Sequence, residues 1–385
     1  MTIPGRRHSA EHEGALPQSE TLLSFPTSTA RQRLLRWYKH HGRHDMPWRK
    51  TRDPYRVWVS EIMLQQTTVA TTLPFYLRFL KRFPTLKHLA RAKLEQVLSV
   101  WSGLGYYARA RNLHRAVKMV LKECGGKVPD GLLELRRLPG IGRYTAGAIR
   151  SLAFGLPAPI LDGNVTRVLS RVLGIREDVR LSKNQEQLWK HAEAMADSLQ
   201  ARDVNLALFD LGATVCRPND PLCGVCPLRG LCQAQALCIQ EQIPFKTAPV
   251  RRQAVTWLVP LIHKDEKLLL ALRKQTGLFA GLWEFPSIET ASRISQIETL
   301  QDTFKRWGLL VAVDKALPSV LHSLTHRDFT MKPFLCRWIT GQPEIEQTGL
   351  YNRFKWVAPE DIDSMAVSNL TRKILKATNN AEALA

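Results

Sequence analysis

The sequence predicts an all-α domain followed by an α+β domain. Three observations support this prediction. Apolar residues recur at helical spacing from residue 27 to about residue 201, where strand patterns are nearly absent. Residues 240–252 contain prolines and read as a linker. Beyond the linker, runs of β-branched and aromatic residues become frequent. A chain of 385 residues, 44% of them hydrophobic, is long enough for two packed domains.

The first domain is expected over residues 27–239. Seven of its segments place apolar residues on one face of a helix, and the predicted helices cover residues 29–38, 55–69, 85–100, 108–124, 145–154, 165–173 and 185–198. Residues 1–26 are polar and include Glu11, Glu13 and Glu20. They predict a disordered leader, because a signal peptide needs an apolar core and a transit peptide avoids acidic residues.

The second domain is expected over residues 253–385. Its β-rich runs predict strands over residues 254–263, 267–272, 319–324 and 329–339. Two amphipathic segments, residues 294–307 and 367–377, predict helices. Strands and helices therefore mix in this half of the chain, which is typical of an α+β domain.

The charge favours a polyanionic partner. Lysine and arginine number 55 against 34 acidic residues, so the net charge is +21. DNA is the commonest partner of so basic a protein, although charge alone is weak support for it. The sequence contains no run of about 18 apolar residues that would predict a membrane span. We expect a cytoplasmic protein, where reducing conditions keep cysteines available as ligands.

Four cysteines are clustered in one short segment. Cys216, Cys223, Cys226 and Cys232 are separated by six, two and five residues. Four thiolates in one loop suit a single [4Fe-4S] cube. Zinc is the alternative, but structural zinc sites usually combine two cysteine pairs that lie well apart in sequence. The compressed spacing here favours the iron–sulfur cluster.

A glycine-containing hairpin precedes one of the predicted helices. Residues 138–146 read Leu-Pro-Gly-Ile-Gly-Arg-Tyr-Thr-Ala, with Gly140 and Gly142 permitting a tight turn. The first N–H groups of the following helix would offer a seat for a phosphate. The motif resembles the helix-hairpin-helix of DNA repair proteins. A plain helix corner with glycine caps is the alternative.

Two isolated carboxylates have the properties of an acid–base pair. Glu61 lies among apolar residues, and Asp162 immediately precedes a predicted helix. Burial would raise the pKa of Glu61 and keep it protonated, while Asp162 would stay ionised. Cleavage of a glycosidic bond needs one carboxyl of each kind. The alternatives are a solvent-facing glutamate and a helix N-cap aspartate.

Taken together, these motifs resemble the MutY family of adenine DNA glycosylases. The resemblance covers nearly all of residues 30–385. Its strings occur in the family's order: Pro47-Trp48-Arg49, Ser60-Glu61-Ile62-Met63-Leu64-Gln65-Gln66-Thr67, Gly103-Leu104-Gly105-Tyr106-Tyr107, the hairpin, Asp162-Gly163-Asn164-Val165 and the four cysteines. It implies an enzyme that flips out adenine opposite 8-oxoguanine or guanine and hydrolyses its glycosidic bond. We expect a monomer that binds double-stranded DNA and no membrane.

The resemblance also implies catalytic roles. Glu61 would protonate the departing adenine and then help to activate water. Asp162 would stabilise the oxocarbenium ion or a short-lived covalent sugar adduct, and Tyr144 and Asn164 would line the site. Endonuclease III relatives, which also cut the strand, carry a lysine at the position of Tyr144. Because a phenol cannot form a Schiff base, the tyrosine predicts a monofunctional glycosylase.

DNA-contacting roles follow in the same way. Trp48 and Arg49 would border the adenine pocket. Gln66 and Tyr106 would wedge into the base stack, with Gln65 next to them. For the aromatic residues Trp58 and Tyr107 we expect ordinary core packing instead.

The second domain resembles the MutT-like, Nudix-fold domain of the same family, with Leu268–Arg273 and Gly277–Pro286 as the matching strings. Lys305 and Arg306 replace two metal-binding glutamates, so no nucleotide hydrolysis is expected. Leu324, Thr325 and His326 stand where the family often has Phe-Ser-His to read the damaged guanine. A second departure is Leu206, which replaces a Gln or Glu that touches the adenine edge.

Two other functions fit part of the pattern. A thymine or uracil mismatch glycosylase of the same fold can also carry tyrosine in the hairpin. A DNA-binding iron–sulfur protein without enzymatic activity would explain the charge, the hairpin and the cysteines. It would leave Glu61 and Asp162 without a role.

Overall fold

The computed structural model describes residues 25–245, 252–290, 295–324 and 326–382. The predicted leader lies almost wholly outside the described residues, as do residues 246–251 of the predicted linker. The chain divides into two compact units. Unit 1 combines Met1–Met46 with Arg150–Thr247, and unit 2 combines Pro47–Ile149 with Ala248–Ala385. The helical part of the sequence therefore contributes to both units.

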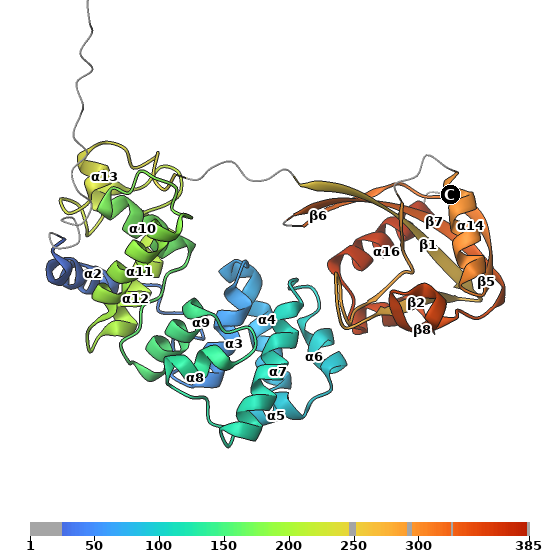
Figure 1. Ribbon diagram of the computed structural model, residues 1–385, viewed down its shortest axis with the longest axis horizontal. Coiled ribbons are helices and arrows are strands. Elements are labelled where there is room, and N and C mark those ends of the chain that lie inside the picture. The colour runs from blue at the N-terminus through green and yellow to red at the C-terminus, as the bar shows by residue number, and fades with distance from the viewer. Residues whose placement is uncertain (1–24, 246–251, 291–294, 325, 383–385) are drawn as a thin grey trace, which may run out of the picture. The chain divides into compact units, whose positions relative to one another are not determined.

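Unit 1 is helical throughout its described residues. Its α-helices are α2 (Thr27–His41), α10 (Gly163–Leu173), α11 (Ser182–Ala196), α12 (Ala201–Asp210) and α13 (Gln233–Ala236) (Figure 1). A π-helical turn, Leu211–Val215, follows α12 directly. An ion pair joins the segment after α2 to the end of α12: Arg43 Nε lies 2.6 Å from the fully buried carboxylate of Asp210. This pair holds the segment after α2 against the segment that leads to the cysteines.

The helical part of unit 2 contains short helices joined by tight loops. They are α3 (Pro54–Leu64), α4 (Val69–Arg82), α5 (Leu86–Arg91), α6 (Leu94–Trp101), α7 (Ala108–Glu123), α8 (Leu132–Arg137) and α9 (Arg143–Ala148), which continues as the π-helical turn Ile149–Ala153. Asp53 caps α3 by accepting from the backbone N–H groups of Tyr55 and Arg56. No helix in the described part of the chain has the length and hydropathy needed to cross a bilayer.

One predicted helix ends early, another is divided in two, and the sequence prediction missed α4 and α12. The segment 55–69 stops at Leu64 because Gln66 adopts a positive φ of 56° and Thr68 begins a new helix as its N-cap. The segment 85–100 is divided by Ala92 and Lys93, which have extended backbone angles. Both interruptions create loops on the surface of unit 2.

The C-terminal part of unit 2 is built on one mixed sheet. Its strands are β1 (Gln253–Lys264), β2 (Lys267–Arg273), β3 (Trp283–Glu284), β4 (Ile288–Thr290), β5 (Leu309–Ala316), β6 (Val320–Ser323), β7 (Arg327–Gly341) and β8 (Tyr351–Val357). The central order is β3-β2-β1-β7-β5, and β1 and β7 run parallel from Gln253↔Arg327 to His263↔Arg337. The predicted α+β class is confirmed, although the sequence prediction missed the strands β3, β4, β5 and β8.

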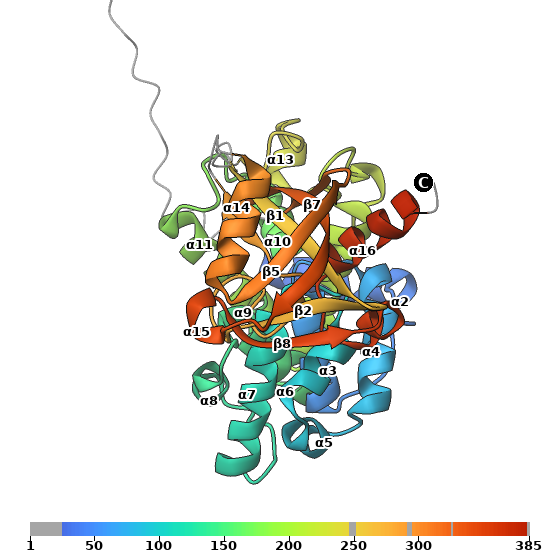
Figure 2. The ribbon, with the colours of Figure 1, turned by 90° about the vertical axis from the view of Figure 1, so that its right-hand side faces the viewer.

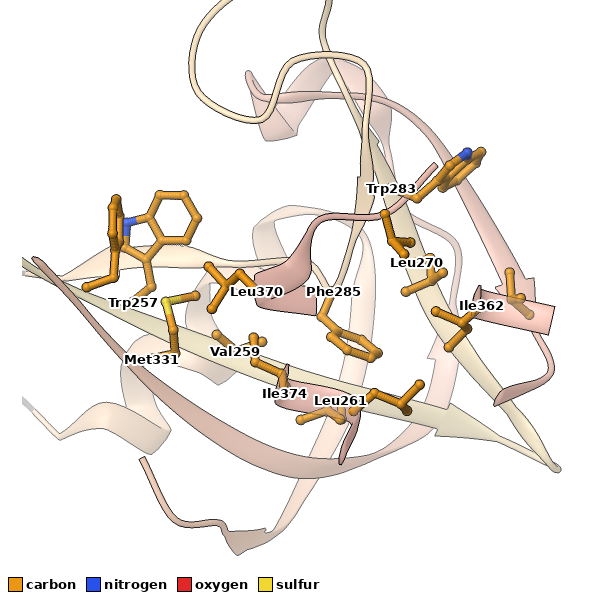
Figure 3. Close-up of a cluster of buried hydrophobic side chains, with 14 of the residues drawn as sticks. Trp257, Val259, Leu261, Leu270, Trp283, Phe285, Met331, Ile362, Leu370 and Ile374 are labelled. Carbon is orange, nitrogen blue, oxygen red and sulfur yellow. The ribbon is translucent and has the colours of Figure 1, made fainter. Parts of the chain in front are cut away.

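Helices cover both faces of this sheet (Figures 1 and 2). Alternate residues of β1 point to opposite faces, as in any strand. Trp257, Val259 and Leu261 pack with Leu370 and Ile374 of α16 (Asn369–Glu382), in the cluster drawn in Figure 3. On the other face, the core cluster that contains Leu258 and Ile262 includes Leu300 and Phe304 of α14 (Gln296–Arg306). The sheet is thus packed between two hydrophobic cores.

Candidate active site and DNA-binding cleft

Glu61 is a buried carboxyl on α3. It is 4% exposed, and its helix is apolar on nearly every side between Val57 and Met63. The hydroxyl of Tyr144, in the first turn of α9, donates a hydrogen bond of 2.7 Å to Glu61 Oε2. Unit 2 therefore brings together two predicted site residues that are 83 positions apart in the sequence.

Asp162 caps α10 in unit 1. Its Oδ1 accepts from the backbone N–H of Val165 at 2.7 Å, and its Oδ2 accepts from Asn164 Nδ2 at 3.2 Å. Burial raises the pKa of Asp162 above its ordinary value. The hydrogen bonds from Val165 and Asn164 and the positive charge of Arg167 act in the opposite direction. The effect of desolvation is the larger one, so the pKa of Asp162 is raised. The sequence instead predicted an aspartate that ionises readily.

A hydrogen-bonded chain leads from Asp162 to the cysteine segment. Arg167 Nη2 donates to Asn164 Oδ1 and to the carbonyl of Gly212, both at 2.8 Å. Its Nε donates to the carbonyl of Cys216, also at 2.8 Å. Sequence reasoning missed Arg167. Its position three residues after Asn164, on the same helix face, was the available signal.

The hairpin between α8 and α9 exposes both of its glycines. Gly140 has a φ of 80°, and a side chain there would place its Cβ only 2.7 Å from Asn112 Cβ. Glycine is therefore required at this position. Gly142 caps α9, and open space surrounds the position a Cβ would take. The backbone at Gly142 can be approached closely by a ligand.

Two loops of unit 2 present exposed side chains in left-handed backbone conformations. Gln66 has a φ of 56°, and Tyr106 has a φ of 50° and is 47% exposed. Such conformations are uncommon for residues other than glycine and persist only where the surroundings impose them. Next to Gln66, the amide of Gln65 points inward and donates to Thr145 Oγ1 at 3.1 Å.

Arg109, a residue that sequence reasoning also missed, joins these two loops. Burial lowers the pKa of Arg109 to about 10, so it remains charged at neutral pH. Its Cζ lies 5.1 Å from the ring centroid of Tyr106. Its guanidinium also donates to both sides. At the end of α3 and in the loop after it, the acceptors are the carbonyls of Ile62 and Met63 (2.9 Å each) and of Gln65, and Thr67 Oγ1 (3.3 Å). In the loop before α7, the acceptor is the carbonyl of Gly105 (3.2 Å). One side chain thus holds both exposed loops.

A cleft of about 860 Å³ lies within unit 2. It is lined by Gln66, Tyr106, Leu324 and His326, which the sequence predicted at DNA-reading positions, and by Tyr107, for which core packing was expected. Thr325 lies outside the described residues. Basic and aromatic side chains complete much of the lining, among them Arg111, Arg252, Phe279, His322 and Arg327. The size and the positive charge suit part of a nucleic acid strand.

The loop that carries Tyr106 is hydrogen-bonded to the C-terminal half of unit 2. The carbonyl of Val367 accepts from Ser102 Oγ at 2.6 Å and from the hydroxyl of Tyr107 at 3.0 Å. Asn369 Nδ2 donates to the carbonyl of Gly103 at 2.9 Å. Tyr107 is 8% exposed, but its hydroxyl gives it a role beyond the core packing that we expected.

The other predicted contact residues differ in accessibility. Trp48 is 6% exposed and packs edge-on against Tyr76, with ring centroids 5.3 Å apart, while Arg49 is half-buried. Leu206 is 5% exposed on α12 of unit 1. Trp58 is completely buried in α3, as expected of a core residue.

All four clustered cysteines line one cavity of unit 1, together with the guanidinium-bearing Arg171. Burial raises the pKa of Cys226 to about 12. Among the described residues, no three His, Cys, Asp or Glu side chains form a group that could hold a single metal ion. The cavity thus brings together the four cysteines Cys216, Cys223, Cys226 and Cys232.

Comparison with known proteins finds a matching family model in each half of the chain. Residues 59–194 match the model of the HhH-GPD superfamily of base excision DNA repair proteins, and residues 258–377 match the NUDIX domain. A solved thermostable thymine-DNA glycosylase aligns with a TM-score of 0.50 at 31% identity, covering 57% of this chain and 99% of that chain.

Full-length relatives are more informative than this structural match. The adenine DNA glycosylase of Homo sapiens is 36% identical over 401 residues, which cover 89% of this chain and 72% of the human protein. That of Buchnera aphidicola is 35% identical over 305 residues, covering 79% of this chain and 86% of the relative. The chain therefore belongs to the adenine DNA glycosylases, enzymes of base excision repair that cleave the N-glycosidic bond of adenine.

Proposed function

We propose that this glycosylase removes adenine paired with 8-oxoguanine or guanine, without cutting the DNA strand. The hydrogen bond from Tyr144 to the buried carboxyl of Glu61 is the observation that best supports the chemistry. It fixes the orientation of the carboxyl of Glu61, which is proposed to act toward a purine as general acid. Adenine is a poor leaving group until a ring nitrogen is protonated, so a positioned proton donor is the first requirement.

Asp162 is proposed to act on the sugar. As the C–N bond lengthens, positive charge develops on the sugar ring, and a carboxylate beside it stabilises that charge or adds to it covalently. Asn164 holds the carboxylate through Oδ2, and the N–H of Val165 holds it through Oδ1. Glu61, deprotonated after the first step, then activates the water that completes hydrolysis.

The absence of strand cleavage follows from the residue at position 144. A lyase reaction of this class needs an amine that forms a Schiff base with the sugar carbon. Tyr144 offers a phenol, which donates to Glu61 and cannot form an imine. The product is then an abasic site in an intact strand.

The cleft of unit 2 is proposed to read the base opposite adenine. Gln66 and Tyr106 would enter the base stack, where an aromatic face stacks on any base. Leu324 cannot stack in this way, but Phe279 lines the same cleft with a φ of 55° and packs edge-on against Trp257. Phe279 can therefore supply the aromatic surface. Thr325 and His326 are proposed as hydrogen-bonding groups.

The C-terminal domain is proposed to recognise DNA and not to hydrolyse nucleotides. Lys305 and Arg306 are exposed in the last turn of α14, where the Nudix enzymes that the domain resembles place metal-binding glutamates. Two cations at these positions repel a magnesium ion. On the helical side, the hairpin at Gly140 and Gly142 is proposed to hold a phosphate through backbone N–H groups.

Trp48 and Arg49 are proposed to border the adenine pocket. Leu206 cannot hydrogen-bond to the adenine edge, so selectivity would rest on Arg49, Glu61 and backbone groups. The enzyme is proposed to act as a monomer in the cytoplasm.

We propose a [4Fe-4S] cluster held by Cys216, Cys223, Cys226 and Cys232. The four cysteines share one cavity, and Arg171 reaches into it with a positive charge, which suits an anionic set of ligands. When bound, the cluster would supply structural cross-links that hold Arg217 and Arg229 near the DNA phosphates. None of the proposed chemical steps passes through it.

Base release from four duplexes tests the proposed function. With A:8-oxoG, A:G, T:G and U:G pairs, we expect adenine release from the first two and no thymine or uracil release. Asp162→Asn should lower the single-turnover rate by roughly 10²- to 10³-fold, as when a group that stabilises transition-state charge is removed. The variant should fold, because asparagine is also a good N-cap.

DNA binding by Asp162→Asn provides the control. Its affinity for the A:8-oxoG duplex should remain close to that of the unaltered chain. A variant that released adenine at the original rate would remove Asp162 from the mechanism. Release of thymine or uracil in preference to adenine would instead favour the mismatch-glycosylase alternative.

A further inference from the structure

Arg171 is a fully enclosed arginine in the last turns of α10. Only 2% of its surface is exposed. Its guanidinium donates four hydrogen bonds, and the acceptors are the carbonyls of Ile243 (2.8 Å), Arg217 (2.6 Å) and Pro218 (3.0 Å) and the sulfur of Cys216 (3.4 Å). The side chain therefore joins two segments of unit 1, residues 216–218 and the segment at Ile243, to α10.

None of these four acceptors on the described residues is a carboxylate. Backbone carbonyls satisfy the N–H groups but carry no charge to offset the cation. A buried charge without a countercharge is strongly unfavourable. Arg167, four positions earlier on the same helix, donates through Nε to the backbone carbonyl of Cys216 at 2.8 Å, so a second cation lies beside the cysteine segment. The buried guanidinium of Arg171 would be stabilised by an anion close to it.

The cavity next to Arg171 is where that anion would sit. All four clustered cysteines line it, and Nη1 of Arg171 points to the sulfur of Cys216. The backbone carbonyl of Arg171 lies 3.4 Å from the sulfur of Cys232, so the residue contacts the first and the last cysteine of the set. Neutral thiols would leave the cation uncompensated, whereas metal-bound cysteines are thiolates.

We propose that Arg171 is the internal counter-ion of the cysteine-bound iron–sulfur cluster. The inference rests on the proposed [4Fe-4S] cluster and identifies the residue that retains it. Arg171 is a positioning residue, because it acts through Cys216 and touches neither DNA nor the reacting atoms. Its charge and its hydrogen bond to sulfur should also raise the reduction potential of the cluster, because both stabilise the more negative reduced form.

The test uses the full-length chain purified without oxygen. Arg171→Met keeps an unbranched apolar stem and removes the charge, and Arg171→Lys keeps the charge but loses the planar fork. Arg176→Met is the matched control, because Arg176 is exposed five residues further along. The measurements are iron and sulfide per chain, the rate at which a chelator removes iron, and the reduction potential by voltammetry.

Arg171→Met should lose iron to the chelator roughly 10- to 100-fold faster than the unaltered chain, the range found for outer-shell partners of metal sites. Its reduction potential should shift downward, and Arg171→Lys should restore part of both properties. Arg176→Met should match the unaltered chain. If Arg171→Met yields no soluble protein, faster iron release from Arg171→Lys alone supports the proposal.

Three results would overturn the assignment. The first is unchanged iron release in Arg171→Met, or in Arg171→Lys where that variant alone is soluble. The second is an equal loss in Arg176→Met, which would indicate a general effect of charge. The third is a potential that does not move. An unaltered chain that holds zinc, or no metal and no sulfide, would instead refute the cluster itself.

Discussion

At the scale of single residues, the environment of Asp162 decides how the proposed chemistry depends on pH. The carboxyl is desolvated, which favours its protonated form, while two donors and Arg167 favour the ionised form. The net effect raises the pKa of Asp162. A desolvated carboxylate is also a stronger partner for a sugar cation, because the interaction is less screened by water. Burial of the Asp162 carboxyl thus accounts both for its reactivity at neutral pH and for the expected loss of activity in acid.

The activity should therefore fall on the acid side at a higher pH than an ordinary aspartate would dictate. Asp162 must be ionised to act, so the rate declines as pH falls through its pKa. Because the pKa is raised, the decline should begin above about pH 4, the usual aspartate value. Single-turnover rates on an A:8-oxoG duplex between pH 4 and 8 measure it. A decline centred at or below the ordinary value would contradict this assignment.

Tyr144 should control whether the enzyme becomes covalently linked to DNA. With the unaltered chain, borohydride should trap no protein–DNA adduct, because a phenol forms no imine. Tyr144→Lys should give a trapped adduct. Tyr144→Phe is the control, since it removes the hydrogen bond to Glu61 without adding an amine. Strong trapping with the unaltered chain would refute monofunctional action.

At the scale of helices and loops, periodicity predicted most helices but not their interruptions. The amphipathic pattern of residues 55–69 continues through Gln65–Thr68, yet the chain turns there. The reason is tertiary: Arg109, more than forty positions away, binds the carbonyls of Met63 and Gln65. No local propensity encodes a long-range contact of this kind. Glu61 could be predicted because its string is specific, whereas Arg109 stands in no recognisable motif.

Replacing Arg109 by lysine should uncouple the two exposed loops. Lysine has three donors on one nitrogen and cannot reach acceptors in both loops at once. We expect the rate of adenine removal from A:8-oxoG to fall by roughly 10²-fold, as when reacting groups are misplaced by about 1 Å. Arg115→Lys, at an exposed position on the same helix, should have little effect. Equal rates in the two variants would exclude the proposed coupling.

At the scale of the whole molecule, the sequence predicted the change from helices to a sheet but not the division into units. The predicted boundary at residues 240–252 marks the start of the β-rich half. The structure adds a second division near Met46 and Ile149, within the helical half. Composition could not reveal it, because both sides of the division are helical. Asp162 and Glu61 consequently belong to different units.

The net charge of the whole chain predicts strongly salt-dependent DNA binding. Phosphates neutralised by lysine and arginine release counterions, so affinity falls as salt rises. Between 50 and 200 mM salt we expect a loss of roughly 10³-fold or more, if six or more phosphates are contacted. The affinity is measured by titrating duplex DNA with the Asp162→Asn variant at each salt concentration, because this variant should not release the base during the measurement. An affinity independent of salt would argue against phosphate contacts by the hairpin and the basic cleft.

The carbonyl of Val367 has a consequence for shortened versions of the protein. It accepts from Ser102 and Tyr107, which flank the glycine turn before Tyr106. A premature stop codon upstream of β1 would leave every proposed catalytic side chain encoded while stripping both hydroxyls of their acceptor. The protein made from such a gene should retain reduced activity, because the loop that carries Tyr106 would be held less firmly. The residues of the reaction centre would be unchanged, so examining them alone would not explain the defect.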